Sequence, residues 1–163
     1  MKKIYLFILL LLLLVSCKNN KSNYNIDILD IYGRYYYDEC IYLDPSITYT
    51  NLNEETTKYH NIARFVLNET SYYFYDSSST EPLTTMKGVS YEKKETTTNL
   101  KLDNNIKELI KDYNIRFDII YNKHNQGYAF IFGNSGTCYI ELRYDSNTDN
   151  YEIYKIIKIR KYE

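Results

Sequence analysis

The sequence has no tryptophan and holds two histidines, three cysteines, five glycines and two prolines among 163 residues. So few glycines leave no glycine-rich loop of the kind that cradles phosphate groups. The two histidines, His60 and His124, have no cysteine or acid at the spacing of a metal site. No nucleophile elbow or zinc-protease helix motif is recognisable either. We therefore expect no cofactor, and we expect that the protein is not an enzyme.

One hydrophobic run is present, and it is short. It covers the twelve residues from Ile4 to Val15 and follows Lys2 and Lys3. A helix that spans a bilayer needs roughly 20 apolar residues, so this run is too short for a stable span. A basic start and a short apolar core are typical of an export signal that is later removed.

The end of this run, Leu14-Val15-Ser16-Cys17, resembles the lipobox of bacterial lipoproteins. The resemblance covers residues 1–17. It implies that diacylglycerol is attached to the Cys17 thiol, that the chain is cut before Cys17, and that the freed amine receives an acyl chain such as palmitate. Two or more chains give stable anchoring. The protein is then exported and anchored to a bacterial membrane, the outer membrane where the cell has one. The alternative is an ordinary secretory signal with a chance cysteine.

The expected domain organisation follows from this cut. Residues 1–16 are the removed signal peptide, residues 17–25 are the lipidated cysteine with a polar, aperiodic flexible tether, and residues 26–163 are a single β-rich domain. The chain from residue 17 has 147 residues, with 18 basic and 21 acidic side chains. This length suits one domain. Because nucleic-acid binding calls for a basic surface, the near-neutral balance argues against a nucleic-acid partner.

Alternation of apolar and polar residues dominates the expected domain. It predicts strands or hairpins over residues 32–43, 61–76 and 86–102, and four further strands between 115 and 162. This succession predicts a mainly β fold, an antiparallel meander that closes to a small barrel.

Residues 105–113 break the pattern and predict a short amphipathic helix. Its apolar residues at helical spacing are Ile106, Leu109, Ile110 and Tyr113. Asn105 followed by Glu108 is a capping pattern that would begin the helix. The alternative fold is α+β, with this helix packed on one sheet face.

The domain also resembles lipocalin-like barrels. Gly33 and Tyr35 match the Gly-x-Trp opening of that family except that tyrosine replaces tryptophan, and Arg160 stands where those barrels often carry a closing arginine. The chain departs from the family in the missing tryptophan and in a helix that lies between strands. The resemblance implies a barrel whose cavity holds a small apolar ligand.

Cys40 and Cys138 remain when Cys17 carries lipid. Outside the cytoplasm an even pair can form a disulfide. The first strand and a late strand are neighbours in a closed meander, so a Cys40–Cys138 bridge is expected. Two buried free thiols are the alternative.

Asp145, Asn147 and Asp149 have the spacing that begins a calcium loop. The rest of the loop pattern fails, because Ile156 occupies the position that needs a glutamate. A polar hairpin turn explains the same residues, and the metal site is the weaker interpretation.

Tyrosine is abundant, with 21 residues and two dense runs. The candidates for an interaction surface are Tyr35, Tyr36, Tyr37, Tyr72, Tyr73 and Tyr75. Tyrosine is also an ordinary strand residue, but rigid amphipathic rings give contact area at low entropic cost. We expect an interaction or structural module that contacts an envelope protein or a glycan. The alternative is a binder of a small apolar ligand.

Overall fold

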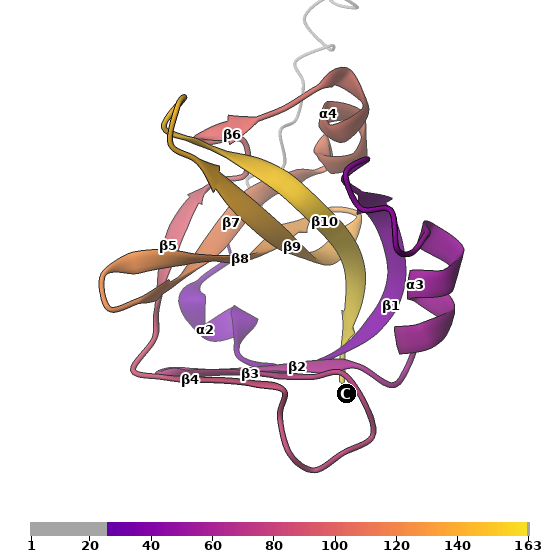
Figure 1. The fold of residues 1–163 in the computed structure, drawn as a ribbon. Coiled ribbons are helices and arrows are strands. Elements are labelled where there is room, and N and C mark those ends of the chain that lie inside the picture. Colours follow the sequence, from indigo (N-terminus) through magenta and orange to yellow (C-terminus); the bar gives the residue numbers. More distant parts are fainter. Residues whose placement is uncertain (1–25, 163) are drawn as a thin grey trace, which may run out of the picture.

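The computed structural model describes residues 26–162, which form a curled antiparallel β-sheet with short helices around it (Figure 1). In chain order the elements are α2 (Ile28–Ile31), β1 (Gly33–Leu43), α3 (Leu52–Tyr59), β2 (Arg64–Asn68), β3 (Ser71–Tyr75), β4 (Thr84–Lys87), β5 (Ser90–Glu95), β6 (Leu100–Lys101), α4 (Asn104–Ile110), β7 (Tyr113–Tyr121), β8 (His124–Gly133), β9 (Gly136–Asp145) and β10 (Asn150–Lys161).

Nine strands lie side by side in the order β4-β3-β2-β1-β10-β9-β8-β7-β5. The short β6 stands outside this path and pairs in parallel with β10. Because β10 pairs antiparallel with β1, the first and last strands of the chain are neighbours, and the sheet curls into a half-barrel (Figure 1). The prediction of a mainly β, meander-like antiparallel fold is confirmed.

The two ends of this strand order, β4 and β5, are separated in the chain by Gly88 and Val89 alone. The backbone N–H groups of these two residues donate to the Thr70 carbonyl at 2.7 and 3.1 Å. The Tyr91 hydroxyl on β5 donates to the Asn68 carbonyl at 3.0 Å. These bonds hold β5 against the β2–β3 turn, so the connecting residues join the two ends of the sheet.

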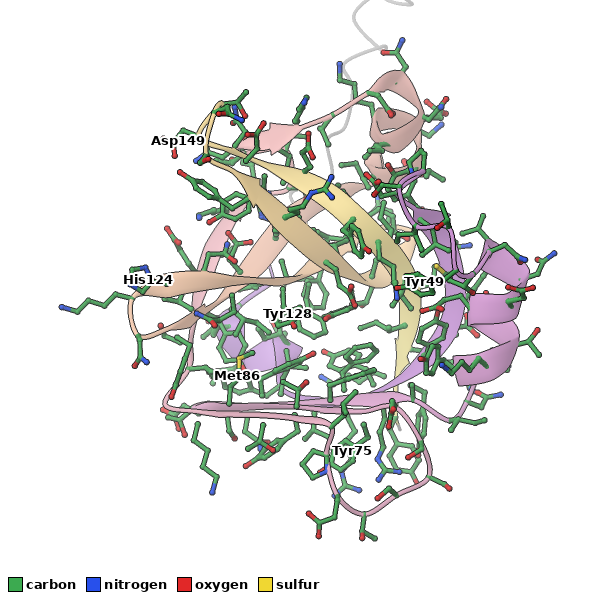
Figure 2. All side chains as sticks on the ribbon, in the orientation of Figure 1. Tyr49, Tyr75, Met86, His124, Tyr128 and Asp149 are labelled. Atoms are coloured by element: carbon green, nitrogen blue, oxygen red, sulfur yellow. The ribbon has the colours of Figure 1, made fainter. Side chains whose placement is uncertain are left out.

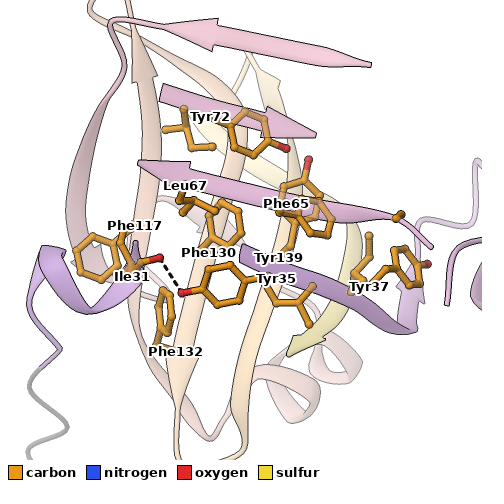
Figure 3. Packing of buried hydrophobic residues seen from close by; sticks show 14 of the residues in the cluster. Ile31, Tyr35, Tyr37, Phe65, Leu67, Tyr72, Phe117, Phe130, Phe132 and Tyr139 are labelled. Atoms are coloured by element: carbon orange, nitrogen blue, oxygen red, sulfur yellow. Dashed lines mark hydrogen bonds between the residues drawn. The ribbon is translucent and has the colours of Figure 1, made fainter. Parts of the chain in front are cut away.

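The inner side of the half-barrel is packed with aromatic rings (Figure 3). The ring centroid of Phe65 lies 4.5 Å from that of Tyr139 and 5.1 Å from that of Phe74. A buried tyrosine hydroxyl needs a partner, and that of Tyr35 donates to the Ile31 carbonyl at 2.7 Å. Alternate residues of the strands therefore supply a solid aromatic core.

A second core lies on the other face of β7–β10, beneath α4 and β6. Ile106 and Ile110 of α4 are buried there against strand residues such as Ile131 and Ile140. Helix α4 is thus packed on one face of the sheet, as the alternative α+β fold predicted, although the domain as a whole is mainly β. Both faces of this part of the sheet are consequently buried.

The predicted helix is present, but its limits and its packing differ from the prediction. It begins at Asn104 and ends at Ile110, and its N-cap is Asp103, whose Oδ1 accepts from the Ile106 N–H at 2.8 Å. The predicted cap at Asn105 is therefore wrong. Leu109, which the helical spacing placed on the apolar face of the helix, is 37 % exposed. Tyr113, the last residue of the predicted helix, already belongs to β7.

Helix α3 was not predicted, because its sequence has no apolar stripe. Asn51 caps it by accepting from the N–H groups of Asn53 and Glu54, each at 3.1 Å. The helix packs on β1 through polar groups, as the Thr56 hydroxyl accepts from the Cys40 N–H at 3.0 Å.

The end of β8 requires glycine. A Cβ atom at Gly133 would stand 1.8 Å from the carbonyl oxygen of Asp112 and 2.6 Å from the Cα of Tyr113. No side chain fits at these distances, so the close approach of β7 and β8 depends on this residue.

Candidate functional site

The six tyrosines predicted as a surface divide between the two faces of the sheet. Three point inward and are at most 2 % exposed: Tyr35, Tyr37 and Tyr72. The other three are half-buried on the outer face, where Figure 2 shows Tyr75: Tyr36, Tyr73 and Tyr75. The surface prediction is therefore wrong for the inward tyrosines, because neighbouring strand residues face opposite ways and the inward ones form the core.

The outward tyrosines belong to a row that crosses four neighbouring strands. Tyr75 of β3 is the direct partner of Arg64 on β2, Arg64 is the partner of Tyr36 on β1, and Tyr36 is the partner of Arg160 on β10. We call these residues, Tyr75, Arg64, Tyr36 and Arg160, the Tyr/Arg row. Rings and guanidinium groups alternate along it.

The guanidinium of Arg64 stacks on the ring of Tyr75. The Arg64 Cζ lies 4.3 Å from the ring centroid, within the range of a cation–π interaction. The Arg64 Nη2 also donates to the Ser79 carbonyl at 2.6 Å. These contacts fix the positions of the Arg64 and Tyr75 side chains on the outer face.

The other end of the row opens into a depression of about 710 Å³. Its lining residues are Tyr36, Asn61, Arg160, Lys161 and Tyr162. The rings of Tyr36 and Tyr162 lie 5.6 Å apart between centroids and are inclined at 55°. The Arg160 Nη2 donates to the side-chain oxygen of Asn61, and the Asn61 N–H donates to the Tyr37 carbonyl at 3.0 Å. Backbone and side chain thus fix the loop beside the depression.

Several basic groups lie on this outer face. Arg34, Arg64 and Lys87 occupy it on β1, β2 and β4, and Arg160 occupies it on β10. Asp38 is the acid in contact with them, with its Oδ1 4.0 Å from the Arg160 Nε. The face therefore combines aromatic rings with positive charge, although the whole chain is close to neutral.

The lipocalin-like resemblance had placed a closing arginine at position 160. The side chain of Arg160 is 58 % exposed and lies on the outer face. The cation beside Tyr35 is Lys161 instead, whose Nζ lies 5.9 Å from that ring centroid and donates to the Asp30 carbonyl at 2.8 Å.

A second group of charges lies between α3 and the sheet. The Lys155 Nζ is 2.6 Å from the Glu55 Oε1, and Lys155 is the strand partner of Glu141. Burial opposes the charged amine, but Glu141 and Glu55 outweigh it and raise the pKa of Lys155. Burial raises the pKa of Glu141. The Glu55–Lys155 ion pair secures α3 on the sheet.

Cys40 and Cys138 are free thiols, so the predicted disulfide is wrong. Cys40 on β1 is the partner of Ile157, and Cys138 on β9 is the partner of Lys158, so β10 lies between them. Cys40 also faces the inner core and Cys138 the second core. Burial raises the pKa of both thiols to about 11, which disfavours a nucleophilic thiolate at neutral pH.

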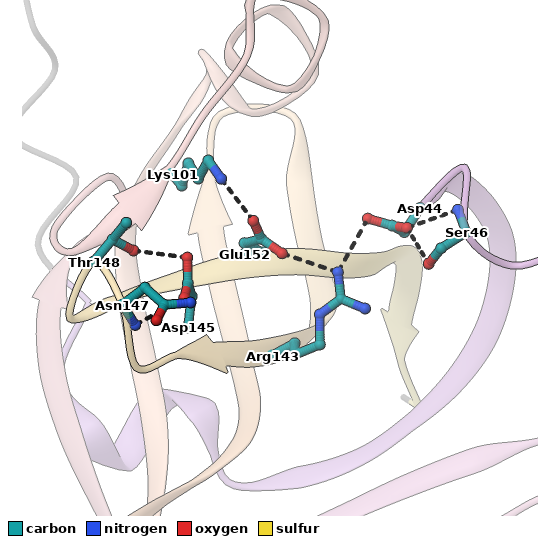
Figure 4. Close-up of polar contacts among 8 residues, drawn as sticks. All are labelled: Asp44, Ser46, Lys101, Arg143, Asp145, Asn147, Thr148 and Glu152. Atoms are coloured by element: carbon teal, nitrogen blue, oxygen red, sulfur yellow. Dashed lines mark hydrogen bonds and ion pairs between the residues drawn. The ribbon is translucent and has the colours of Figure 1, made fainter.

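The calcium candidates form a hairpin turn (Figure 4). The Asp145 carboxylate accepts from the Asn147 N–H at 2.9 Å and from the Thr148 hydroxyl at 3.0 Å, and these bonds lower its pKa. Asp149 accepts from the Tyr144 hydroxyl at 2.7 Å. Within residues 26–162 there is no group of three or more His, Cys, Asp or Glu side chains placed to hold a metal ion.

A cleft of about 440 Å³ lies near this turn, between β6, α4 and β10. Its charges are paired: Glu152 contacts Lys101 at 2.8 Å and Arg143 at 2.9 Å, and Arg143 also lies 3.9 Å from Asp44 (Figure 4). This balance distinguishes the cleft from the basic outer face.

Comparison with protein-family models, with curated proteins and with solved structures finds no match for this chain. The proposed lipid site, Cys17, lies outside the described residues. Among the described helices, none has the length and apolar character needed to cross a membrane. The candidate site is therefore defined by the geometry of the Tyr/Arg row.

Three members of this site were not predicted from the sequence: Arg64, Asn61 and Tyr162. The alternation of Phe65 and Leu67 places Arg64 on the outer face, so that signal was present in the sequence. The sequence contains no comparable signal for Asn61 and Tyr162, because their meeting depends on the pairing of β1 with β10.

Proposed function

We propose that this chain is a lipid-anchored protein of the bacterial envelope that binds a macromolecular partner through the Tyr/Arg row and the depression at its end. The role is that of an interaction module and requires no chemical step. The observation that carries the proposal is the alternation of rings and guanidinium groups across β3, β2, β1 and β10.

Tyrosine and arginine are the residue types that dominate binding energy at protein interfaces. Here they stand on a rigid sheet, and Arg64 is already ordered by its contacts to Tyr75 and Ser79. Side chains that are ordered before binding lose less entropy when a partner arrives. The row therefore has the composition and the preorganisation of a binding surface.

The alternative function, a small apolar ligand held inside the barrel, has weaker support. Rings such as Phe65, Phe130 and Tyr139 occupy the interior, with centroids 4.5–6.1 Å apart (Figure 3). A core filled by its own side chains is usual for a small barrel. An adduct in native mass spectrometry that organic solvent removes would favour this alternative.

The anchor is tested by metabolic labelling with a fatty-acid analogue. The native chain should be labelled, and the Cys17→Ala variant should not be. Equal labelling of the two chains would contradict the lipid site.

The binding face is tested by a photo-crosslinking amino acid placed at position 75 or at position 144 in cells. Tyr144 is a matched control because it is 53 % exposed and its hydroxyl donates to Asp149. Figure 2 shows Asp149 at the opposite end of the molecule from Tyr75. We expect covalent adducts from position 75 and not from position 144. No adduct at position 75, or equal adducts at both positions, would refute the proposed face.

A further inference from the structure

We infer that the depression at the end of the Tyr/Arg row binds an acidic sugar, and that the row binds the glycan chain which carries it. This inference rests on the proposed function and names the chemistry of the partner. Three features of the outer face lead to it: a pair of rings, an adjacent guanidinium group, and the alternation of rings and guanidinium groups along the row.

The ring pair can hold a sugar. Tyr162 is 59 % exposed, and its ring is inclined at 55° to that of Tyr36, with 5.6 Å between centroids. The face of an aromatic ring is electron-rich, and the C–H face of a pyranose is apolar and slightly positive. The two faces therefore attract each other. The volume of about 710 Å³ lies within the range of small-ligand sites.

The adjacent Arg160 guanidinium selects an acidic group. Arg160 lines the same depression as the two rings, whereas the Lys161 Nζ is directed to the Asp30 carbonyl. The Arg160 guanidinium carries five N–H donors. One of its nitrogens, Nη2, donates to the Asn61 side chain, and another, Nε, lies 4.0 Å from the Asp38 Oδ1. The planar fork of the guanidinium matches a carboxylate. A uronic-acid type of sugar offers both a pyranose face and a carboxylate.

The alternation along the row points to a polymer of such sugars. Tyr36 and Tyr75 stand two strands apart, about 10 Å at the usual strand spacing, with Arg64 between them. A glycan that presents ring faces and carboxylates in turn can follow this order. An acidic peptide would match the cations and would leave the ring faces without a matching surface.

The test is calorimetric titration of the full chain, extracted in a nonionic detergent, with tetragalacturonate. The comparison ligands are the same tetrasaccharide with its carboxylates reduced to alcohols, hexaglutamate, and vesicles of phosphatidylglycerol. We expect binding of tetragalacturonate and much weaker binding of all three others. Added salt should weaken the binding, because the Arg160 side chain is exposed.

Matched variants locate the site. Arg160→Gln and Tyr162→Ser should each weaken tetragalacturonate binding by about tenfold or more, the effect of losing a central contact. The controls Arg143→Gln and Tyr144→Ser change an arginine and a tyrosine of similar exposure, 51 % and 53 %, in other parts of the surface. They should leave the affinity within about twofold, as for peripheral contacts. Unchanged melting temperatures show that the variants fold.

Several results would overturn the inference. Equal binding of the reduced tetrasaccharide would exclude recognition of the carboxylate. Binding of hexaglutamate or of the vesicles as tight as that of tetragalacturonate would exclude recognition of the sugar. Absence of binding, or equal effects of the Arg160→Gln and Arg143→Gln variants, would exclude the site. If crosslinks from position 75 persist in these cases, the proposed interface stands and its ligand class is wrong; if they are absent, the proposed function fails with it.

Discussion

Replacing Asp118 by asparagine should lower the free energy of unfolding by about 3–5 kcal/mol, the cost of breaking a buried ion pair from one side. Asp118 and Arg116 are both fully buried on β7, and the Arg116 Nε lies 2.7 Å from the Asp118 Oδ1. The Lys94 Nζ lies 3.0 Å from the Asp118 Oδ2, and the Arg116 Nη1 donates to the Thr96 carbonyl at 2.9 Å. One carboxylate thus contacts two cations, and one of these cations has no access to water.

The assay is urea denaturation followed by tyrosine fluorescence and far-ultraviolet circular dichroism, since the chain has no tryptophan. The matched control is Glu92→Gln. Glu92 contacts the same Lys94 at 2.9 Å, but its side chain is 54 % exposed. Water screens such a pair, so its loss should cost about 0.2–1 kcal/mol.

The double variant Arg116→Met/Asp118→Leu separates the cost of an unpaired buried charge from the contribution of the ion pair itself. Apolar side chains of similar size can replace a buried ion pair at little cost, so the double variant should be more stable than Asp118→Asn. A loss of unfolding free energy in Asp118→Asn no larger than that in Glu92→Gln would refute the role of the buried ion pair. A double variant as unstable as Asp118→Asn would refute it as well.

The remaining predictions concern the second core, one glycine and the thiols, and each is checked by the same denaturation assay. Ile110→Ala should cost about 2–4 kcal/mol, whereas Leu109→Ala should cost under about 1 kcal/mol; similar losses would contradict the packing of α4. Gly133→Ala should cost more than either, because the carbonyl facing its Cα leaves no room for a methyl group. Unfolded thiols ionise near pH 8.5 while Cys40 and Cys138 ionise at about 11. Stability should therefore fall as pH rises through this window, by about 1.4 kcal/mol per pH unit for each thiol, and Cys40→Ala should reduce the slope.

The strands could be predicted because their inward residues repeat at a period of two. Phe65 and Leu67 on β2 show this plainly, and both are fully buried. Helix α3 could not be predicted in the same way, because the residue it buries is Glu55. An acid becomes a core residue there only because Lys155, 100 positions away, supplies the opposite charge.

The candidate site was only partly predictable for two reasons. Three consecutive tyrosines on β1 look the same on either face, so the sequence does not reveal which of them points inward. The pairing of β1 with β10 then decides the neighbours, and it includes an irregularity between Tyr37 and Glu39. The disulfide prediction failed for the same reason: Cys40 and Cys138 are one strand too far apart and face different cores.

The position of α2 connects the proposed anchor with the proposed binding face. Lys161, which lines the depression, donates to the carbonyl of Asp30 in α2 at 2.8 Å. The first element of the described domain therefore lies beside the depression. Thirteen positions separate Cys17 from Asp30, and an extended chain spans at most about 3.3–3.6 Å per residue. A lipid on Cys17 would therefore hold the depression within roughly 45 Å of the membrane surface. A glycan attached to that membrane, or lying along it, would meet the face at a high effective concentration, so modest affinity at each ring and each cation would suffice for lasting contact.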